Sequence, residues 1–242
     1  MPPASIFGQA EKTREIFRLL SKKAATRLNE HLRWWRSHES KCNLMSWTSS
    51  LLFALQHDLR RHQTDDDKPE MSQISLLILD TCGFLTVTFI KDLEIMEVFA
   101  LSTDLNQTKN LDDLFYLRKS DRVYYFGEYL TQGIEDARDR CVVTNMQKLI
   151  DAGLFKLIPE LGDKNRWGEW TNEIVCLREL FNASQNTPTA TYTEVRKAII
   201  IAVTCFGNDW DISVAIMLLA LKRRQRKDPV IINGFVAIFA GK

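Results

Sequence analysis

The sequence predicts a mainly α-helical protein: a multi-helix globular bundle with a small antiparallel β element at about 74–100 and a C-terminal hairpin at 230–239. Apolar residues recur with the period of a helix over long stretches, and residues that commonly cap helices precede several of them. Asn-Gly between two apolar runs near the C-terminus is a strong hairpin signal. The 242 residues, 45% of them hydrophobic, can fill one sizeable core. We therefore expect a single globular domain over 1–242, or two lobes with a boundary near 183–191.

Two helices are expected in the N-terminal quarter of the chain. Residues 11–39 carry an apolar stripe of helical period. Basic residues gather on the opposite flank and would form a ridge along the helix axis: Arg18, Lys22, Arg33 and Arg36. Residues 44–62 have the same period and can begin after a cap at Asn43 or at Ser46. The acidic run QTDDDKPE then predicts an exposed loop.

The segment 74–101 leaves two interpretations open. The run LTVTFI alternates and is rich in β-branched and aromatic residues, which favours two strands about a turn at 80–83. The alternative is a pair of buried helices, because short apolar runs occur in both structures. We favour the β element.

Further helices are predicted in the rest of the chain, at 111–119, 121–140, 141–152, 165–182, 194–206 and 209–227. Asn110 and Ser120 can cap the first two of these, and Gly153 suits the end of the third. Thr191-Tyr-Thr-Glu194 matches a capping box, in which the threonine caps the helix and the glutamate reaches back. Between these helices, the small polar residues of 183–191 predict a linker.

The predicted hairpin is apolar on both faces and needs a cover from its own domain or from a neighbour. We therefore expect self-association through its apolar residues, which are Val230, Ile231, Ile232, Phe235, Val236, Ile238 and Phe239.

The net charge of +1 hides an uneven layout along the chain. Residues 1–62 carry +6, residues 63–121 carry −7, residues 122–187 carry −2 and residues 188–242 carry +4. The densest basic cluster is a run at the end of a predicted helix: Lys222, Arg223, Arg224, Arg226 and Lys227. Basic ends of this kind can bind polyanions, and opposite charges can also join copies of the chain head to tail.

Motifs for catalysis or metal binding are not evident. We find no phosphate loop, Rossmann fingerprint, nucleophile elbow or C-x-x-C pair. His38, Cys42, His57 and His62 only loosely imitate a zinc spacing, and the scattered cysteines are expected to be reduced. The sequence therefore predicts no metal, no cofactor and no nameable catalytic residue. Without a secretory signal or an apolar run long enough to span a membrane, we expect an intracellular protein.

These observations favour a non-enzymatic interaction protein that self-associates and binds a polyanion, either RNA or an anionic membrane surface. The cluster at 222–227 also suits a nuclear import receptor, so the expected location is cytoplasmic or nuclear. The architecture is comparable with that of small viral matrix or nucleocapsid-associated proteins, by analogy alone. Two alternatives stay open: a helical or metal-dependent nuclease that uses residues at 31–70, and a protein-binding adaptor without a nucleic-acid role.

One aromatic residue is a separate candidate for partner contact. In LRWWRSHE, Trp35 continues the apolar stripe of the first helix, whereas Trp34 lies about 100° away, at the stripe's edge. We expect Trp34 to stack on a ligand or partner, and Trp35 to be part of the core.

Overall fold

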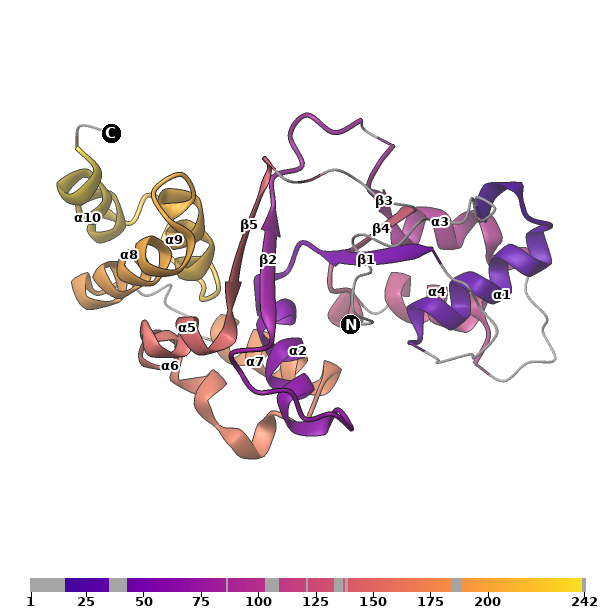
Figure 1. Ribbon diagram of the computed structural model, residues 1–242, viewed down its shortest axis with the longest axis horizontal. Coiled ribbons are helices and arrows are strands. Elements are labelled where there is room, and N and C mark those ends of the chain that lie inside the picture. Colours follow the sequence, from indigo (N-terminus) through magenta and orange to yellow (C-terminus); the bar gives the residue numbers. More distant parts are fainter. Residues whose placement is uncertain are drawn as a thin grey trace. The chain divides into compact units, whose positions relative to one another are not determined.

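A computed structural model describes residues 16–34, 43–85, 87–102, 109–120, 122–132, 137, 139–183 and 189–240 (Figure 1). These residues are mainly helical and include short antiparallel strands, which confirms the predicted mainly α class with a small β component. The chain divides into two compact units. Unit 1 comprises Met1–Ser49 and Thr81–Arg138, and unit 2 comprises Ser50–Asp80 and Asp139–Lys242. The 183–191 segment, at which we expected a boundary between lobes, lies within unit 2.

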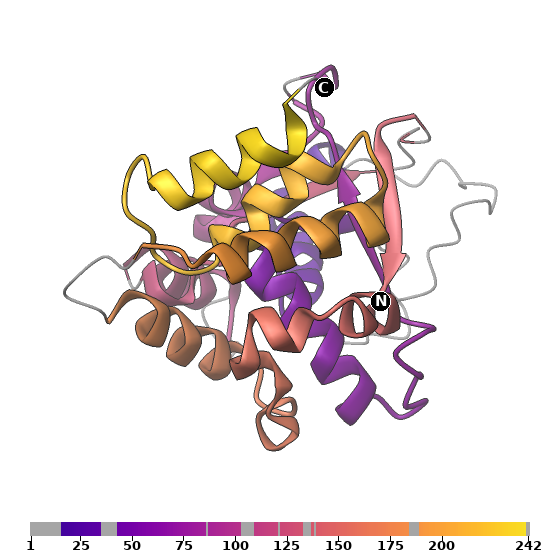
Figure 2. The same ribbon diagram turned by 90° about the vertical axis from the view of Figure 1, so that its left-hand side faces the viewer.

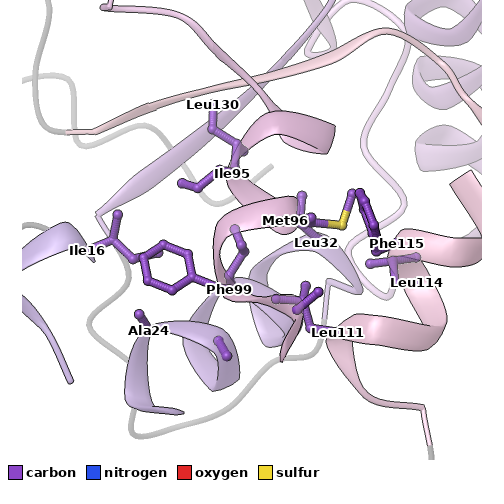
Figure 3. Close-up of a cluster of buried hydrophobic side chains, with 13 residues drawn as sticks. Ile16, Ala24, Leu32, Ile95, Met96, Phe99, Leu111, Leu114, Phe115 and Leu130 are labelled. Atoms are coloured by element: carbon purple, nitrogen blue, oxygen red, sulfur yellow. The ribbon is translucent and has the colours of Figure 1, made fainter. Parts of the chain in front are cut away.

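In its described residues, unit 1 combines three α-helices with a three-stranded antiparallel sheet in the order β1-β4-β3. Its described elements are η1 (Ile16–Arg18), α1 (Ser21–Leu32), β1 (Leu44–Thr48), β3 (Ile90–Lys91), α3 (Asp92–Phe99), η2 (Ala100–Ser102), α4 (Leu111–Ser120), η3 (Arg122–Tyr124) and β4 (Glu128–Gln132). The sheet contributes Leu130 to a core that is otherwise built mostly from helical side chains such as Leu28, Met96 and Leu111 (Figure 3). The helices therefore cover the sheet face that carries Leu130.

Unit 2 combines seven α-helices, among its described residues, with a two-stranded antiparallel sheet, β2 and β5. Its described elements are α2 (Leu51–Thr64), β2 (Ser75–Leu79), β5 (Cys141–Asn145), α5 (Met146–Asp151), α6 (Leu154–Leu157), η4 (Pro159–Gly162), η5 (Lys164–Arg166), α7 (Thr171–Asn182), α8 (Tyr192–Phe206), α9 (Asp211–Leu219) and α10 (Pro229–Phe239). The helix α8 packs against both α9 and α10 (Figure 2). No helix in the described residues has the length and apolar content that a membrane-spanning segment needs.

The predicted C-terminal hairpin is wrong, because Pro229–Phe239 form the helix α10. The Asp228 carboxylate accepts hydrogen bonds from the amides of Val230 and Ile231, and Pro229 occupies the first turn, where its missing N–H costs nothing. Gly234, the expected turn residue, lies buried inside the helix against Val195 of α8. Close packing between these two helices therefore uses the glycine that the sequence associates with a turn.

Three other segments that were predicted to be helical contain strands in the structure. Residues 44–48 form β1, and the helix that follows begins only after Ser50, whose side chain accepts from the Phe53 amide. The predicted helices over 121–140 and 141–152 likewise contain the strands β4 and β5. Pairing with distant strands is a tertiary effect that overrides a local helical period.

The β element expected at 74–100 exists, but its two strands do not pair with each other. β2 joins β5 in unit 2, and β3 joins β4 in unit 1. Residues 92–99 are helical.

Several helix ends lie where the sequence predicts them. The capping box of Thr191 and Glu194 is present and opens α8, which ends at Gly207. Asn110 and Asp113 exchange hydrogen bonds at the start of α4. Gly153 follows α5 with a φ of 108°, as a left-handed end position requires.

Candidate functional site

A chain of hydrogen bonds in unit 1 joins five side chains from five different elements, which we call the polar chain: His31 of α1, Ser46 of β1, Glu128 of β4, Arg118 of α4 and Asp92 of α3. His31 Nε2 lies 2.9 Å from Ser46 Oγ, and the Ser46 hydroxyl donates to Glu128 Oε1 at 2.6 Å. Arg118 Nη1 donates to Glu128 Oε2 at 2.7 Å and also to Asp92 Oδ2. Both oxygens of Glu128 are therefore held by donors.

Strand register explains why Ser46 and Glu128 meet. β1 and β4 are antiparallel, with Ser46 opposite Leu130 and Thr48 opposite Glu128. Ser46 and Glu128 are thus diagonal neighbours on one face of the sheet, within reach of each other. This face also carries the buried Leu130, so the polar chain lies where the helices of unit 1 cover the sheet.

Burial and charge set the protonation of the polar chain. Burial lowers the pKa of His31, and the nearby carboxylate of Glu128 only partly opposes this, so the imidazole is neutral at neutral pH. Burial also works to lower the pKa of Arg118, but the carboxylates of Glu128 and Asp92 outweigh it and raise this pKa. The pKa of Asp92, which is wholly buried, is raised by burial against the opposing charge of Arg118.

These protonation states define a direction for the hydrogen bonds. Because the Ser46 hydroxyl donates to Glu128, its oxygen accepts from His31, which assigns the neutral imidazole proton to Nε2. Two acidic side chains face one guanidinium, so acidic groups outnumber basic ones in the polar chain. A neutral ligand, or one that develops positive charge, suits this excess of acidic groups better than a polyanion.

Four of the five residues of the polar chain were missed by sequence reasoning. Ser46 and Glu128 lie in segments predicted as helix, where their common sheet face cannot be recognised. Asp92 and Arg118 occur at ordinary positions for helix ends. His31 falls within the 31–70 region named for the nuclease alternative, but the sequence assigns it no role of its own. No single segment of the sequence contains a signal for an arrangement that joins five elements.

The basic ridge predicted on the first helix is only partly described. Lys22 is exposed, whereas Arg33 donates to Asn29 Oδ1 at 2.9 Å and to the carbonyl of Asn110 at 2.8 Å. Arg33 therefore joins α1 to the start of α4. The side chain of Arg18 and all of Arg36 lie outside the described residues.

Trp34 follows the end of α1 in a left-handed conformation, with a φ of 59°, and is 39% exposed. Because α1 ends at Leu32, Trp34 lies beyond the helix on whose stripe it was expected, and its contact with a ligand or partner stays a prediction. Trp35, expected in the core, lies outside the described residues.

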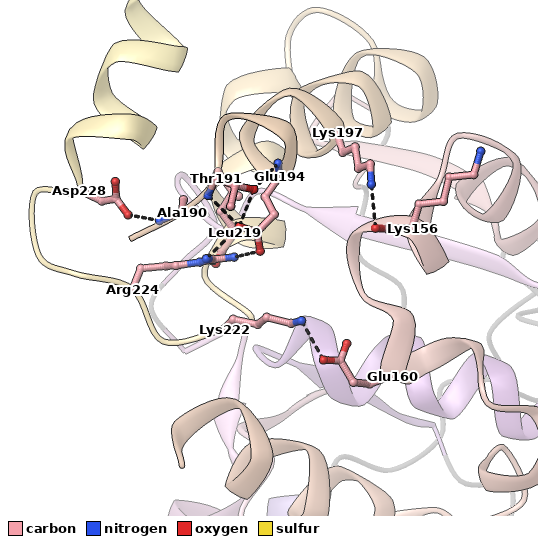
Figure 4. Close-up of polar contacts among 10 residues, drawn as sticks. All are labelled: Lys156, Glu160, Ala190, Thr191, Glu194, Lys197, Leu219, Lys222, Arg224 and Asp228. Carbon is pink, nitrogen blue, oxygen red and sulfur yellow. Dashed lines mark hydrogen bonds and ion pairs between the residues drawn. The ribbon is translucent and has the colours of Figure 1, made fainter. Parts of the chain in front are cut away.

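The basic cluster at 222–227 follows α9, which ends at Leu219, and is not helical as predicted. Lys222 Nζ lies 2.8 Å from Glu160 Oε1, and Arg224 Nη2 lies 2.8 Å from Glu194 Oε1 (Figure 4). The remaining cations are exposed: Arg223, Arg226 and Lys227. Two ion pairs thus attach the segment to unit 2.

The residues expected to mediate self-association now lie on α10. Ile232, Val236 and Ile238 are exposed at 47%, 60% and 44%. The others are half-buried: Val230, Ile231, Phe235 and Phe239. Exposed aliphatic residues also occur on the neighbouring helix α8, at Ile200 and Val203.

The loose zinc spacing cannot be assembled from the described residues. His38 and Cys42 lie outside them, while His57 is buried on α2 and His62 Nδ1 lies 2.8 Å from the carbonyl of Pro69. Within the described ranges, no group of three or more His, Cys, Asp or Glu side chains is placed to hold a metal ion.

Comparisons with protein-family models, with curated proteins and with solved structures find no match to this chain. Its function must therefore be argued from the geometry of these residues.

Proposed function

We propose that the chain is an enzyme that transfers or hydrolyses a glycosyl group at the polar chain of unit 1. The observation that carries the proposal is the setting of Glu128: its side chain is 14% exposed, and Ser46 and Arg118 each hold one of its oxygens. A carboxylate oriented in this way can stabilise the positive charge that develops on a sugar carbon in an oxocarbenium-like transition state.

The other members of the polar chain would have supporting roles. Neutral His31 could exchange a proton with the leaving group or with the incoming hydroxyl. Ser46 and Arg118 act through Glu128 and are positioning residues. Asp92, which has no exposed surface, would hold Arg118 in place.

The test is release of the leaving group from a panel of O-glycosides and N-glycosides, including nucleosides. We expect turnover by the wild type and a loss of at least about 100-fold in Glu128→Gln, which keeps the shape of the side chain but removes its charge. Glu97→Gln is the matched control, because Glu97 forms an exposed ion pair with Lys119 on the same unit. The proposal fails if the wild type releases nothing from any glycoside, or if folded Glu128→Gln is as active as the wild type.

A second candidate is the interaction protein favoured by the sequence, which self-associates and binds RNA or an anionic membrane. It is supported by the exposed cations Arg223, Arg226 and Lys227 and by the aliphatic side chains exposed on α10. Sedimentation of the wild type and of Val236→Asp tests self-association, since charge on a contact surface should dissociate an oligomer. A monomeric wild type would end this part of the proposal.

Separate experiments test the nuclease and adaptor alternatives. Incubation with labelled RNA and DNA, with and without divalent metal, would reveal cleavage. Retrieval of the nuclear import receptor, or of another protein partner, without salt-dependent binding to nucleic acid would favour the adaptor.

A further inference from the structure

We propose that the segment 222–227 and α10 form one docking surface for an anionic lipid membrane, which we call the C-terminal surface. This inference rests on the second candidate function, binding of a polyanion, and names the partner.

The charge of the C-terminal surface is positive after its ion pairs are taken into account. Lys222 is paired with Glu160, and Arg224 with Glu194. The carboxylate of Asp228 is buried and accepts from the amides of Ala190 and Val230 (Figure 4). The three exposed cations, Arg223, Arg226 and Lys227, thus remain directed at solvent, immediately before the first turn of α10.

The apolar part of the C-terminal surface follows directly in the chain. α10 contains no charged residue and exposes Ile232 and Val236, which lie one turn apart on the same face of the helix. Ile238 is also exposed, but it lies about 120° or more around the helix from both and is not part of this face. With 11 residues α10 is about 16 Å long, which is too short to cross a bilayer. A helix of this kind can lie in the plane of the membrane surface, with Ile232 and Val236 at the boundary between headgroups and acyl chains.

The combination of cations with aliphatic residues favours a lipid over the other partners. RNA offers phosphates to the cations, but it is recognised through stacking and hydrogen bonds, for which isoleucine and valine are unsuited. A second copy, bound by a two-fold contact between α10 helices, would cover the aliphatic side chains but would offer no negative charge to the three cations, because α10 contains no charged residue. An anionic membrane offers negative headgroups beside apolar chains and complements both parts of the surface.

Co-sedimentation with vesicles tests the proposal on the full chain. We expect binding to vesicles of phosphatidylcholine mixed with phosphatidylserine, weakened by salt, and little binding to pure phosphatidylcholine. Each of Arg226→Gln and Lys227→Gln should lower the partition coefficient about fivefold, since one basic residue near the surface contributes about 1 kcal/mol. Val236→Asn should also lower it. The matched controls are Lys156→Gln, an exposed cation of α6, and Val143→Asn, an exposed aliphatic residue of β5, and both should bind as the wild type does.

Three outcomes would overturn the proposal. The first is equal binding to neutral and anionic vesicles. The second is salt-dependent binding of RNA but not of vesicles, lost in the same cation variants; this would retain the broader polyanion function while refuting the lipid. The third is binding of neither, which would end both. Circular dichroism of each variant shows whether it is folded.

Discussion

The polar chain of unit 1 and the basic segment 222–227 of unit 2 use charged side chains in opposite ways. In unit 1, Arg118 forms ion pairs with the wholly buried Asp92 and the mostly buried Glu128, so its positive charge is compensated inside the unit. In unit 2, Lys222 and Arg224 pair with partly exposed carboxylates and attach a segment whose other cations face solvent. The buried charges of unit 1 therefore fix the orientation of the polar chain, whereas the ion pairs of unit 2 hold a segment whose other cations form an exposed basic surface.

The sharpest test of this comparison is to remove one arginine from each unit. Arg118→Ala should lower the free energy of unfolding by about 3–5 kcal/mol, because it leaves the buried Asp92 without its counter-ion. Arg224→Ala should cost only about 1 kcal/mol, because Glu194 is 26% exposed and keeps its bonds to Thr191. Urea unfolding followed by circular dichroism measures both. Equal losses would contradict the contrast between the units.

A second test concerns the packing that leaves one side of α10 exposed. Gly234→Ala gains about 1 kcal/mol in helix propensity, but its methyl group would lie 2.7 Å from Val195 Cγ1, and overpacking costs about 1–3 kcal/mol. We expect a net loss of roughly 1 kcal/mol, seen as faster hydrogen exchange of the α10 amides. In the double variant with Val195→Ala, the clash with Val195 Cγ1 is removed, so part of the increase in hydrogen exchange should disappear. A gain in protection from Gly234→Ala alone would show that α10 does not pack on α8 as described.

Acid should weaken the surface ion pair of unit 2 within a defined pH window. Burial alone would raise the pKa of Glu194, but hydrogen bonds from Arg224 and Thr191 outweigh it and lower this pKa from 4.5 to about 2. The stabilisation of the fold by ionised Glu194 is therefore complete above about pH 5, and it is lost as the pH falls from 4.5 towards 2. The difference in unfolding free energy between the wild type and Glu194→Gln should shrink over this window. If this difference does not change with pH, protonation of Glu194 is not the cause of the acid destabilisation.

The last test compares one left-handed residue from each unit. Trp34 has a φ of 59° and Lys227 a φ of 58°. At either position a glycine substitution should be more stable than an alanine substitution by about 1 kcal/mol, because glycine adopts this conformation without a steric penalty. Thermal unfolding of the four variants measures the difference. Alanine variants at least as stable as the glycine ones would contradict the backbone assignment.

Local chemistry accounts for what sequence reasoning recognised correctly. The capping box at Thr191, the cap at Asn110 and the glycine end at Gly153 involve residues a few positions apart, so the sequence contains the whole interaction. The candidate site in unit 1 could not be found in this way, because Ser46 and Glu128 are 82 positions apart and meet only through strand pairing.

By itself, the sequence determined the helical class, the helix ends at Asn110, Gly153 and Thr191, and the position of the basic cluster at 222–227, since these depend on composition, period and near neighbours. The tertiary structure decided which apolar runs became strands, because a strand needs a partner from elsewhere in the chain. It also decided that Asn233-Gly234 lies in a helix, where Asp228 caps the first turn and Val195 occupies the space beside the glycine. Which cations of the 222–227 cluster are paired likewise depends on carboxylates 30 or more positions away, as for Arg224 and Glu194 and for Lys222 and Glu160.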